Sequence, residues 1–447
     1  MLTRNSLVER RAKKAQKMRA SRGKLDAAQS QRIRSKESKS RVLKKKIALE
    51  RAQNAVLRSN LLARRNTSYV NAIQNLQNDT EERFIEDYGP DDDSDVEDSL
   101  LADLSSRFDR WYSDANFFKK MTRFSPIDFD ALFQRVLPIL KNFTLRGSER
   151  NNLAYKPHKL SDRIQFFIAL YLLNEYPTYI TLTAMFVLHD RHLSKYIFRV
   201  LKSIQRAFAN DAIMPVGDEL AMLKQKYDLS NYRSMSGSVF AIDGTEIRIR
   251  RPSDPVEERA HYSVKHKQHA LNLLVIVQLN GVIRWFSPAT KMLQDQAAWN
   301  NLGIRDWFVQ NPDVGILGDG GFTFNPVRLR REPQILGRSP HKRKGRNTSL
   351  TPAQATYNIQ LSRLRVVVEN TFARLKKWKV LRGPLRHYVA NRPSRISPDL
   401  IIAACVGLTN QFLRVQPCRE DGWIPADVSE EDLQRYYRRF GTDIVDV

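Results

Sequence analysis

Residues 238–245 read Ser-Val-Phe-Ala-Ile-Asp-Gly-Thr, and residues 314–321 read Val-Gly-Ile-Leu-Gly-Asp-Gly-Gly. Each stretch holds a short apolar run that predicts a buried strand, and each run ends at an aspartate beside a glycine, Asp243 or Asp319. A carboxylate just past a buried strand lies at the carboxyl edge of the sheet, where open α/β sheets place their sites. The neighbouring glycine lets backbone and ligand approach closely. We therefore expect both aspartates to line one site.

The segments around these stretches predict an α/β core. Asn280-Gly281 is a strong signal for a hairpin turn between two apolar, strand-like runs. Residues 295–302 predict a helix, and Thr351-Pro352 opens a long helix, with threonine as its N-cap and proline at its first position. The order strand, strand pair, helix, strand, helix indicates a mixed sheet.

Glu369 provides a third carboxylate on that long helix. It lies beside Val368, at the margin of the apolar stripe, so we expect it to face the domain rather than open water. Taken singly, an Asp-Gly pair is usually a turn and a helical glutamate is usually solvated. The prediction of a site therefore rests on the combination of two strand-end aspartates with this glutamate. Three converging carboxylates repel each other unless cations are present, and oxygen ligands suit Mg²⁺ or Mn²⁺. Two such ions, about 4 Å apart, can activate a water or a 3′-hydroxyl and stabilise the leaving oxygen at phosphorus.

Basic side chains accompany these carboxylates. Arg365 lies one helical turn before Glu369, and Lys376 lies two turns after it, so both can orient the carboxylate or hold a phosphate. A basic stretch between the second aspartate and the long helix contains Lys342, Arg343 and Lys344. We interpret it as a contact to the DNA backbone, with a solvated loop or an import signal as the alternatives.

The composition indicates a polyanionic partner. The 447 residues carry a formal charge of +26 and have a pI of about 10.1. Such a field favours nucleic acid, with an anionic membrane surface or ribosomal RNA as weaker alternatives. No apolar run reaches 18 residues, so no membrane span is expected. The two cysteines, Cys405 and Cys418, exclude a disulfide framework and a zinc-finger spacing, and are interpreted as free thiols.

The charge is unevenly distributed along the chain. Residues 1–66 hold 21 Lys and Arg against 4 Asp and Glu, whereas residues 79–98 hold 11 acids and one arginine. We therefore predict a basic, largely disordered arm over 1–78 and an acidic linker over 79–99. The lysine and arginine clusters of the arm favour the nucleus, with the cytoplasm or a merely solvated tail as alternatives.

Residues 100–235 read as a helical DNA-binding domain. Ser161 is a candidate N-cap for a helix that is nearly all apolar, and two further helices follow after short breaks. This layout resembles a helix-turn-helix. The last helix would present a polar face with His192, Lys195, Arg199 and Lys202. Of these, Lys195, Arg199 and Lys202 are candidate DNA contacts. The alternative is an ordinary helical bundle with a solvated face.

Residues of about 110–415 resemble transposases of the PIF/Harbinger group. The resemblance is carried by Ala241–Thr245, by Leu317–Phe322, by Tyr262-Ser263 with Lys265 and Lys267, by Cys405–Phe412 and, most specifically, by Arg365–Lys376. The chain departs from the family pattern at Gln294, where a histidine usually precedes the residue equivalent to Asp295, and at Gly320-Gly321, where bulkier residues are frequent.

The resemblance implies a ribonuclease-H-like nuclease core over 236–415 with a catalytic, metal-binding triad of Asp243, Asp319 and Glu369, followed by a C-terminal tail over 416–447. It adds Lys265 and Lys267 to the candidate DNA contacts. It also implies a Myb/SANT-like partner protein and a homodimer.

Three functions follow. The first is an active transposase that hydrolyses DNA at element ends and joins a 3′-hydroxyl to target DNA. The second is a domesticated, non-cutting nuclear DNA-binding protein on the same fold. The third is a nuclease acting on RNA or branched DNA, because the fold does not determine the substrate.

Overall fold

The computed structural model describes residues 98–145, 158–229, 233–292, 295–325, 334–343, 349–386, 396–420 and 422–440. The chain divides into two compact units, Met1–Arg83 and Phe84–Val447, and every described residue belongs to the second. The predicted basic arm over 1–78 and nearly all of the predicted linker over 79–99 lie outside the described residues.

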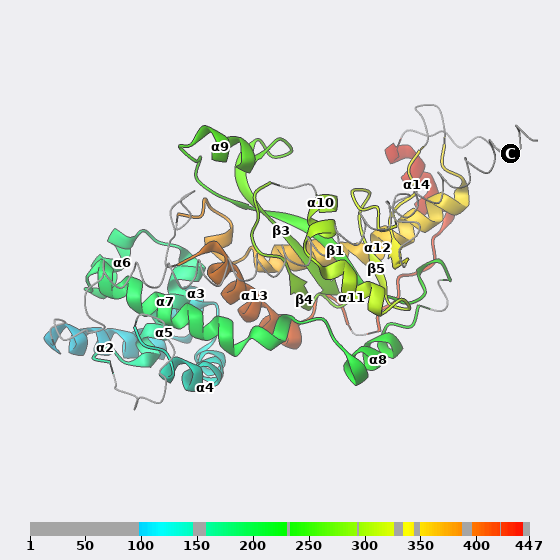
Figure 1. The fold of residues 1–447 in the computed structure, drawn as a ribbon. Helices are drawn as coiled ribbons and strands as arrows, with labels where there is room; N and C mark the ends of the chain where they lie inside the picture. The colour runs from blue at the N-terminus through cyan, green and yellow to red at the C-terminus, as the bar shows by residue number, and fades with distance from the viewer. Residues whose placement is uncertain are drawn as a thin grey trace, which may run out of the picture. The chain divides into compact units, whose positions relative to one another are not determined.

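The first part of the second unit is helical. Its helices are α2 (Asp98–Ser113), α3 (Ala115–Thr122), α4 (Pro126–Lys141), α5 (Asp162–Glu175), α6 (Tyr179–Phe186), α7 (Asp190–Ala207), the short η1 (Ala209–Ala212), α8 (Gly217–Lys226) and η2 (Arg233–Met235) (Figure 1). The predicted N-cap is confirmed, since the Ser161 side chain accepts a hydrogen bond from the Ile164 amide at the start of α5. The helices and the sheet share one compact unit, so a separate DNA-binding domain over 100–235 stays a prediction.

Helix α7 corrects one sequence prediction. His192, Lys195 and Arg199 were expected on an exposed polar face, but their side chains are buried; Lys202 alone is partly exposed. The reason is that α7 packs against α4, α5, α6 and α13 (Pro398–Val415), so most of its circumference faces protein.

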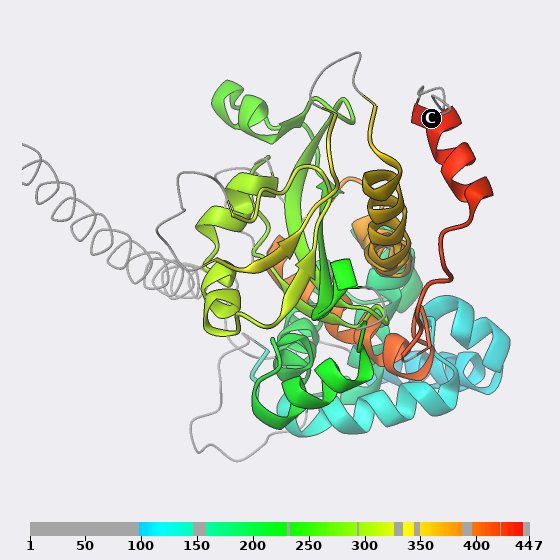
Figure 2. The same ribbon diagram turned by 90° about the vertical axis from the view of Figure 1, so that its right-hand side faces the viewer.

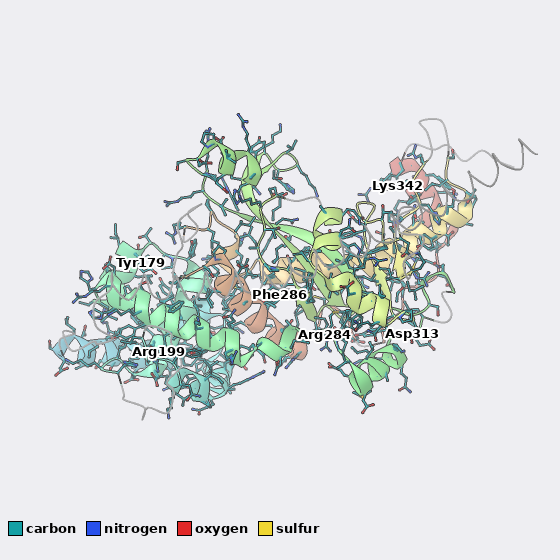
Figure 3. The ribbon with its side chains drawn as sticks, viewed as in Figure 1. Tyr179, Arg199, Arg284, Phe286, Asp313 and Lys342 are labelled. Atoms are coloured by element: carbon teal, nitrogen blue, oxygen red, sulfur yellow. The ribbon has the colours of Figure 1, made fainter. Side chains whose placement is uncertain are left out.

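Arg199 shows how such a buried charge is tolerated. Its guanidinium forms an ion pair of 2.7 Å with Asp162 and donates to the carbonyl oxygens of Leu140 and Phe143. Figure 3 labels Arg199 among the helices of this part. A buried guanidinium needs this set of acceptors, because an unpaired charge inside a protein is strongly unfavourable. Arg199 therefore joins α4, α5 and α7, and its side chain does not reach the surface.

The second part contains a mixed sheet, as predicted. Its strands are β1 (Ser238–Arg248), β2 (Tyr262–Ser263), β3 (Gln268–Gln278), β4 (Ile283–Phe286), β5 (Gly315–Leu317) and β6 (Leu336–Arg338). Their order is β2-β3-β1-β5-β6, and β4 pairs with β3. Strand β1 is antiparallel to β3 and parallel to β5, and β5 is parallel to β6.

The predicted hairpin is confirmed between β3 and β4. Asn280 and Gly281 lie in the turn, and Gly281 has a φ of +101°, a conformation that only glycine adopts without strain. The Cys418 side chain packs at this turn; a Cβ added at Gly281 would lie 2.7 Å from its sulfur. The segment that follows α13 is thereby held against the sheet.

Helices cover both faces of the sheet. Between the strands lie α9 (Pro255–His261), α10 (Asp295–Asn301) and α11 (Ile304–Gln310), and after them come α12 (Pro352–Leu375), η4 (Lys379–Leu381), α13 and α14 (Glu430–Phe440). Figure 2 shows α12 along one face of the sheet, with α10 and α11 on the other. The start of α12 is as predicted: Thr351 and Gln354 form a reciprocal capping box, and Pro352 occupies the first turn.

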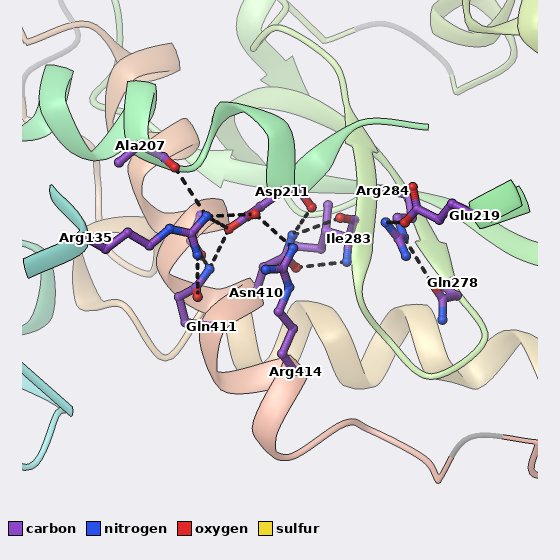
Figure 4. Close-up of polar contacts among 11 residues, drawn as sticks. Arg135, Ala207, Asp211, Glu219, Gln278, Ile283, Arg284, Asn410, Gln411 and Arg414 are labelled. Carbon is purple, nitrogen blue, oxygen red and sulfur yellow. Dashed lines mark hydrogen bonds and ion pairs between the residues drawn. The ribbon is translucent and has the colours of Figure 1, made fainter. Parts of the chain in front are cut away.

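A buried carboxylate links the helices to the sheet through α13. Asp211 of η1 accepts hydrogen bonds from Arg135 of α4 and from Gln411 and Arg414 of α13 (Figure 4). The neighbouring Asn410 amide donates to the carbonyl oxygens of both Asp211 and Ile283 of β4. Each oxygen of the Asp211 carboxylate is satisfied, so this cluster is a structural joint.

No helix in the described ranges is long and apolar enough to cross a membrane.

Candidate active site

Asp243 lies inside a strand, not at its end. The apolar run stops at Ile242, but β1 continues to Arg248 because it pairs with β3 along its whole second half. The prediction that the first strand ends at Asp243 is therefore wrong. The pairing of β1 with β5 does end near Asp243, because the last paired residues of these strands are Ala241 and Leu317.

This register brings the two aspartates to the same level of the sheet. Two residues beyond Ala241 is Asp243, and two residues beyond Leu317 is Asp319. The two chains run parallel at this point, so both aspartates lie just past the carboxyl end of β5. Asp319 is held in its loop by the Gly321 amide, which donates to its Oδ1 over 2.7 Å.

Helix α12 brings Glu369 to the same site through Arg365. The Arg365 guanidinium donates to Asp243 Oδ2 and to Glu369 Oε1, each over 2.9 Å. On β1, Phe240 contacts Trp307 of α11 on the opposite face, and since side chains of a strand alternate, Asp243 points toward α12. One arginine thus connects the strand carboxylate with the helix carboxylate.

The surroundings of Asp243 disfavour its charged form. Burial raises the pKa of Asp243 above its ordinary value, and the negative charge of Asp319 acts in the same direction. Arg365 and the Gly244 amide offset part of this rise by binding the carboxylate. The site therefore collects negative charge that a nearby cation stabilises.

Glu369 is more exposed than the sequence predicts. Its side chain is 53% exposed, whereas those of Asp243 and Arg365 are 18% and 19% exposed. The apolar stripe of α12 passes through Val368 and continues to Leu375, and Glu369 lies on the solvent side of its margin. Its ion pair with Arg365 turns it toward the sheet. Solvent and substrate can therefore reach this carboxylate.

Lys342 lies over the Asp319 loop. A Cβ built on Gly320 would be 3.2 Å from Lys342 Cε, so the absence of a side chain at Gly320 makes room for the lysine. The preceding residue, His341, is fixed to α12, because its amide donates to Asn358 Oδ1 and its carbonyl accepts from Asn358 Nδ2. Asn358 also contacts the Tyr436 hydroxyl of α14, which pins this segment from a second side.

Lys376 is the C-cap residue of α12. Burial lowers the pKa of Lys376, and the negative charge of Glu246 opposes part of this lowering. Glu246 is a second carboxylate of β1, three residues past Asp243. No local sequence pattern singles out Glu246, because its contacts with Ser263 and Gln268 form only in the folded hairpin.

The remaining predicted contacts are spread widely. Lys265 and Lys267 are exposed in the turn before β3, and Lys202 lies over the Phe198 ring of α7. Arg343 is exposed and donates to the Phe440 carbonyl of α14. Lys344 lies outside the described residues. Lys195 and Arg199 are buried in α7, away from the carboxylates, and their assignment as surface contacts is wrong in this structure.

The oxygen atoms of Asp243, Asp319 and Glu369 are the kind of ligand that a hard divalent cation prefers. Three carboxylates from a strand, a loop and a helix supply oxygen ligands, the kind that Mg²⁺ and Mn²⁺ prefer. Across the described ranges, however, no three His, Cys, Asp or Glu side chains lie close enough together to hold an ion. The Arg365 guanidinium occupies the space between two of the carboxylates and supplies the positive charge that they need.

Comparison with known proteins agrees with this geometry. Residues 242–410 match the DDE superfamily endonuclease family. The matched region begins one residue before Asp243 and includes Asp319, Arg365 and Glu369. The chain matches no curated protein and no solved structure.

The DDE superfamily match agrees with the architecture around the site. The mixed sheet and its covering helices are consistent with a ribonuclease-H-like endonuclease fold. The match and the geometry together indicate a transposase-like nuclease domain.

Proposed function

We propose that this protein is a metal-dependent DNA transposase of the PIF/Harbinger type, which hydrolyses phosphodiester bonds at element ends and transfers the 3′-hydroxyl ends to target DNA. Asp243, Asp319 and Glu369 are its catalytic residues. The observation that carries the proposal is the pair of ion pairs by which Arg365 connects Asp243 to Glu369, at the sheet level shared with Asp319.

These three carboxylates would hold Mg²⁺ or Mn²⁺, and we propose that the site takes two such ions. When bound, such ions activate a water or 3′-hydroxyl and stabilise the leaving oxygen at phosphorus. Arg365 orients Asp243 and Glu369, and it must release at least one of them before that carboxylate can bind an ion on the same oxygens. Lys342, beside the Asp319 loop, is placed to hold the phosphate of the scissile bond.

A non-cutting DNA-binding protein on the same fold is the alternative. The observation that favours it is Arg365, because a guanidinium already compensates two of the three carboxylates. We prefer the nuclease, because a purely structural Arg365 would not need an exposed Glu369 or a lysine beside Gly320.

Cleavage of supercoiled plasmid DNA in Mg²⁺ or Mn²⁺ tests the proposal. We expect the wild type to nick or linearise the plasmid, and the double variant Asp243→Asn with Glu369→Gln to bind DNA without cutting it. Equal cleavage by the wild type and a variant that lacks all three carboxylates would refute the assignment. DNA binding without cleavage by the wild type, under every metal condition, would favour the alternative.

Further parts of the proposal rest on the family resemblance. Transposition holds two DNA ends together, so we propose a homodimer, and we propose a Myb/SANT-like partner protein that helps to recognise the ends. The basic clusters near the N-terminus support a nuclear location. Mass measurement in solution and imaging of a tagged chain test these points.

A further inference from the structure

A basic hairpin extends the strand that carries Asp243. It comprises residues 248–269, which include the end of β1, helix α9, strand β2 and the first residues of β3. Figure 1 shows α9 beyond the ends of β1 and β3. The pairings of Arg248 with Ala270 and of Ser263 with Gln268 make the hairpin continuous with the sheet.

The acids of this hairpin are all engaged within the protein. Asp254 caps α9 by accepting from the Val256 and Glu257 amides. Glu257 is buried and pairs with Lys291, and Glu258 pairs with Arg251. No carboxylate of the hairpin is therefore left to neutralise its other basic side chains.

Five basic side chains of the hairpin face solvent. Within the described residues none of them pairs with a carboxylate: Arg248, Arg250, Arg259, Lys265 and Lys267. Holding five like charges on one small element is unfavourable unless an anion compensates them. A regular row of phosphates is the partner that such an arrangement fits.

The tip of the hairpin is held in a defined shape. The Glu246 carboxylate, 14% exposed, accepts from the Ser263 hydroxyl over 2.7 Å and from the Gln268 side-chain amide over 3.3 Å. Ser263 in turn accepts from the His266 amide, and Lys267 adopts a positive φ of 51°. Because these bonds close the turn from inside, Lys265 and Lys267 project from a preorganised loop.

The hairpin lies at a useful distance from the carboxylates. Arg248 is five residues past Asp243 on the same strand, which is about 17 Å at a rise of about 3.4 Å per residue. Phosphates of one DNA strand are spaced about 3.4 Å apart along the helix axis, so this distance spans about five nucleotides. A duplex cut beside Asp243 can therefore extend as far as the hairpin at the end of the same strand.

We propose that residues 248–269 are a grip for the backbone of duplex DNA and that Glu246 is its positioning residue. The proposal rests on the proposed function, since it assumes that the carboxylate edge acts on DNA. It assigns the main backbone contact to this hairpin of the catalytic core, whereas the sequence predicted a DNA-binding domain over residues 100–235 and separate contacts in the core.

The test measures the affinity of the full chain for a duplex of about 30 base pairs over a series of salt concentrations. One variant changes the five hairpin residues (Arg248, Arg250, Arg259, Lys265 and Lys267) to glutamine. A matched control changes five exposed basic residues of α2, α3, α4 and α7 (Arg110, Lys119, Lys120, Lys141 and Arg206) to glutamine. Thermal unfolding confirms that each variant folds, which we expect because all ten side chains are exposed.

We expect the hairpin variant to lose at least about a hundredfold in affinity at 0.1 M salt. The slope of log affinity against log salt concentration should fall by about 4.5, because each of the five lost phosphate contacts contributes about 0.9 to it. The helical control should change the slope by less than about one. The reverse pattern, or equal losses, would overturn the inference and leave the proposed function standing. A wild type that does not bind duplex DNA would overturn the proposed function itself.

Glu246→Gln tests the positioning role separately. The five cations remain, so the salt slope should stay within about one of the wild type, while hydrogen exchange of the amides at 264–267 should accelerate and affinity should fall severalfold. Unchanged exchange and affinity would show that Glu246 does not position the tip.

Discussion

Two clusters of arginine and carboxylate in this protein differ in how completely the carboxylate is satisfied. Asp211, between η1, α4 and α13, is 7% exposed and accepts from Arg135, Gln411 and Arg414. Asp243 receives one arginine and one backbone amide and lies near the like charge of Asp319. The first cluster fills every acceptor and joins helices. The second leaves charge uncompensated at a sheet edge that substrate can reach, which is the arrangement expected of a reactive site.

The largest effect should come from Asp319→Asn. This change leaves the ion pairs of Arg365 intact, so the protein should still fold. The side chain at position 319 loses its negative charge, and with it one of the proposed metal ligands. Even partners in the outer shell of a metal site are worth about 10–100-fold, so we expect plasmid cleavage to fall by more than about a hundredfold. The matched control is Asp313→Asn, on the exposed chain before β5. If Asp319→Asn and Asp313→Asn cleaved the plasmid at similar rates, Asp319 would not be a catalytic residue.

Asp211→Ala should instead affect stability. It leaves Arg135 and Arg414 without their shared acceptor, and breaking a buried pair costs about 3–5 kcal/mol. Arg135 and Arg414 are partly exposed, so water can solvate their charges and reduce this cost. We therefore expect the free energy of unfolding to fall by about 2 kcal/mol. Urea denaturation measures it, with the exposed Asp218→Ala as control. Cleavage per folded molecule should stay within about twofold; a selective loss of cleavage would make Asp211 a functional residue.

Arg365→Gln should lower cleavage by about tenfold or more, because Asp243 and Glu369 lose their common donor. Arg365→Lys should recover little, since an ammonium lacks the fork that reaches both carboxylates. The matched control is Arg363→Gln on the same helix, where the arginine pairs with Asp432 of α14. If Arg363→Gln and Arg365→Gln gave the same rate, the ion pairs at the site would be incidental.

The smallest effect should come from Lys342→Ala. One phosphate contact is lost, so affinity for DNA should weaken similarly for all sequences and the salt slope should fall by about one. Arg435→Ala, on the exposed face of α14, is the control and should leave the slope unchanged. If the salt slope of DNA affinity were unchanged in Lys342→Ala, Lys342 would not contact a DNA phosphate.

Much of the fold followed from local sequence signals. The glycine-containing turn between β3 and β4 and the capped start of α12 depend on residues close in sequence, so they were predicted correctly. The apolar run before Asp319 identified β5 for the same reason. The end of β1 was placed wrongly, because its second half is stabilised by pairing with β3, a partner that no local pattern reveals.

The site was predictable in its residues more than in its contacts. The three carboxylates and Arg365 stand out in the sequence, whereas the position of Lys342 over Gly320 depends on Asn358 and α14 far along the chain. Arg199 shows the opposite error. Its helical spacing resembles an exposed basic face, but tertiary packing surrounds α7 and the guanidinium finds its acceptors inside.

Equilibrium binding of Mn²⁺, followed by electron paramagnetic resonance, tests the central claim most directly. The claim predicts that Asp243→Asn, Asp319→Asn and Glu369→Gln each weaken Mn²⁺ binding by about tenfold or more, whereas Asp211→Asn leaves it unchanged. Binding of Mn²⁺ that is the same in the wild type and in all three site variants would contradict the claim that these carboxylates form the metal site of a nuclease.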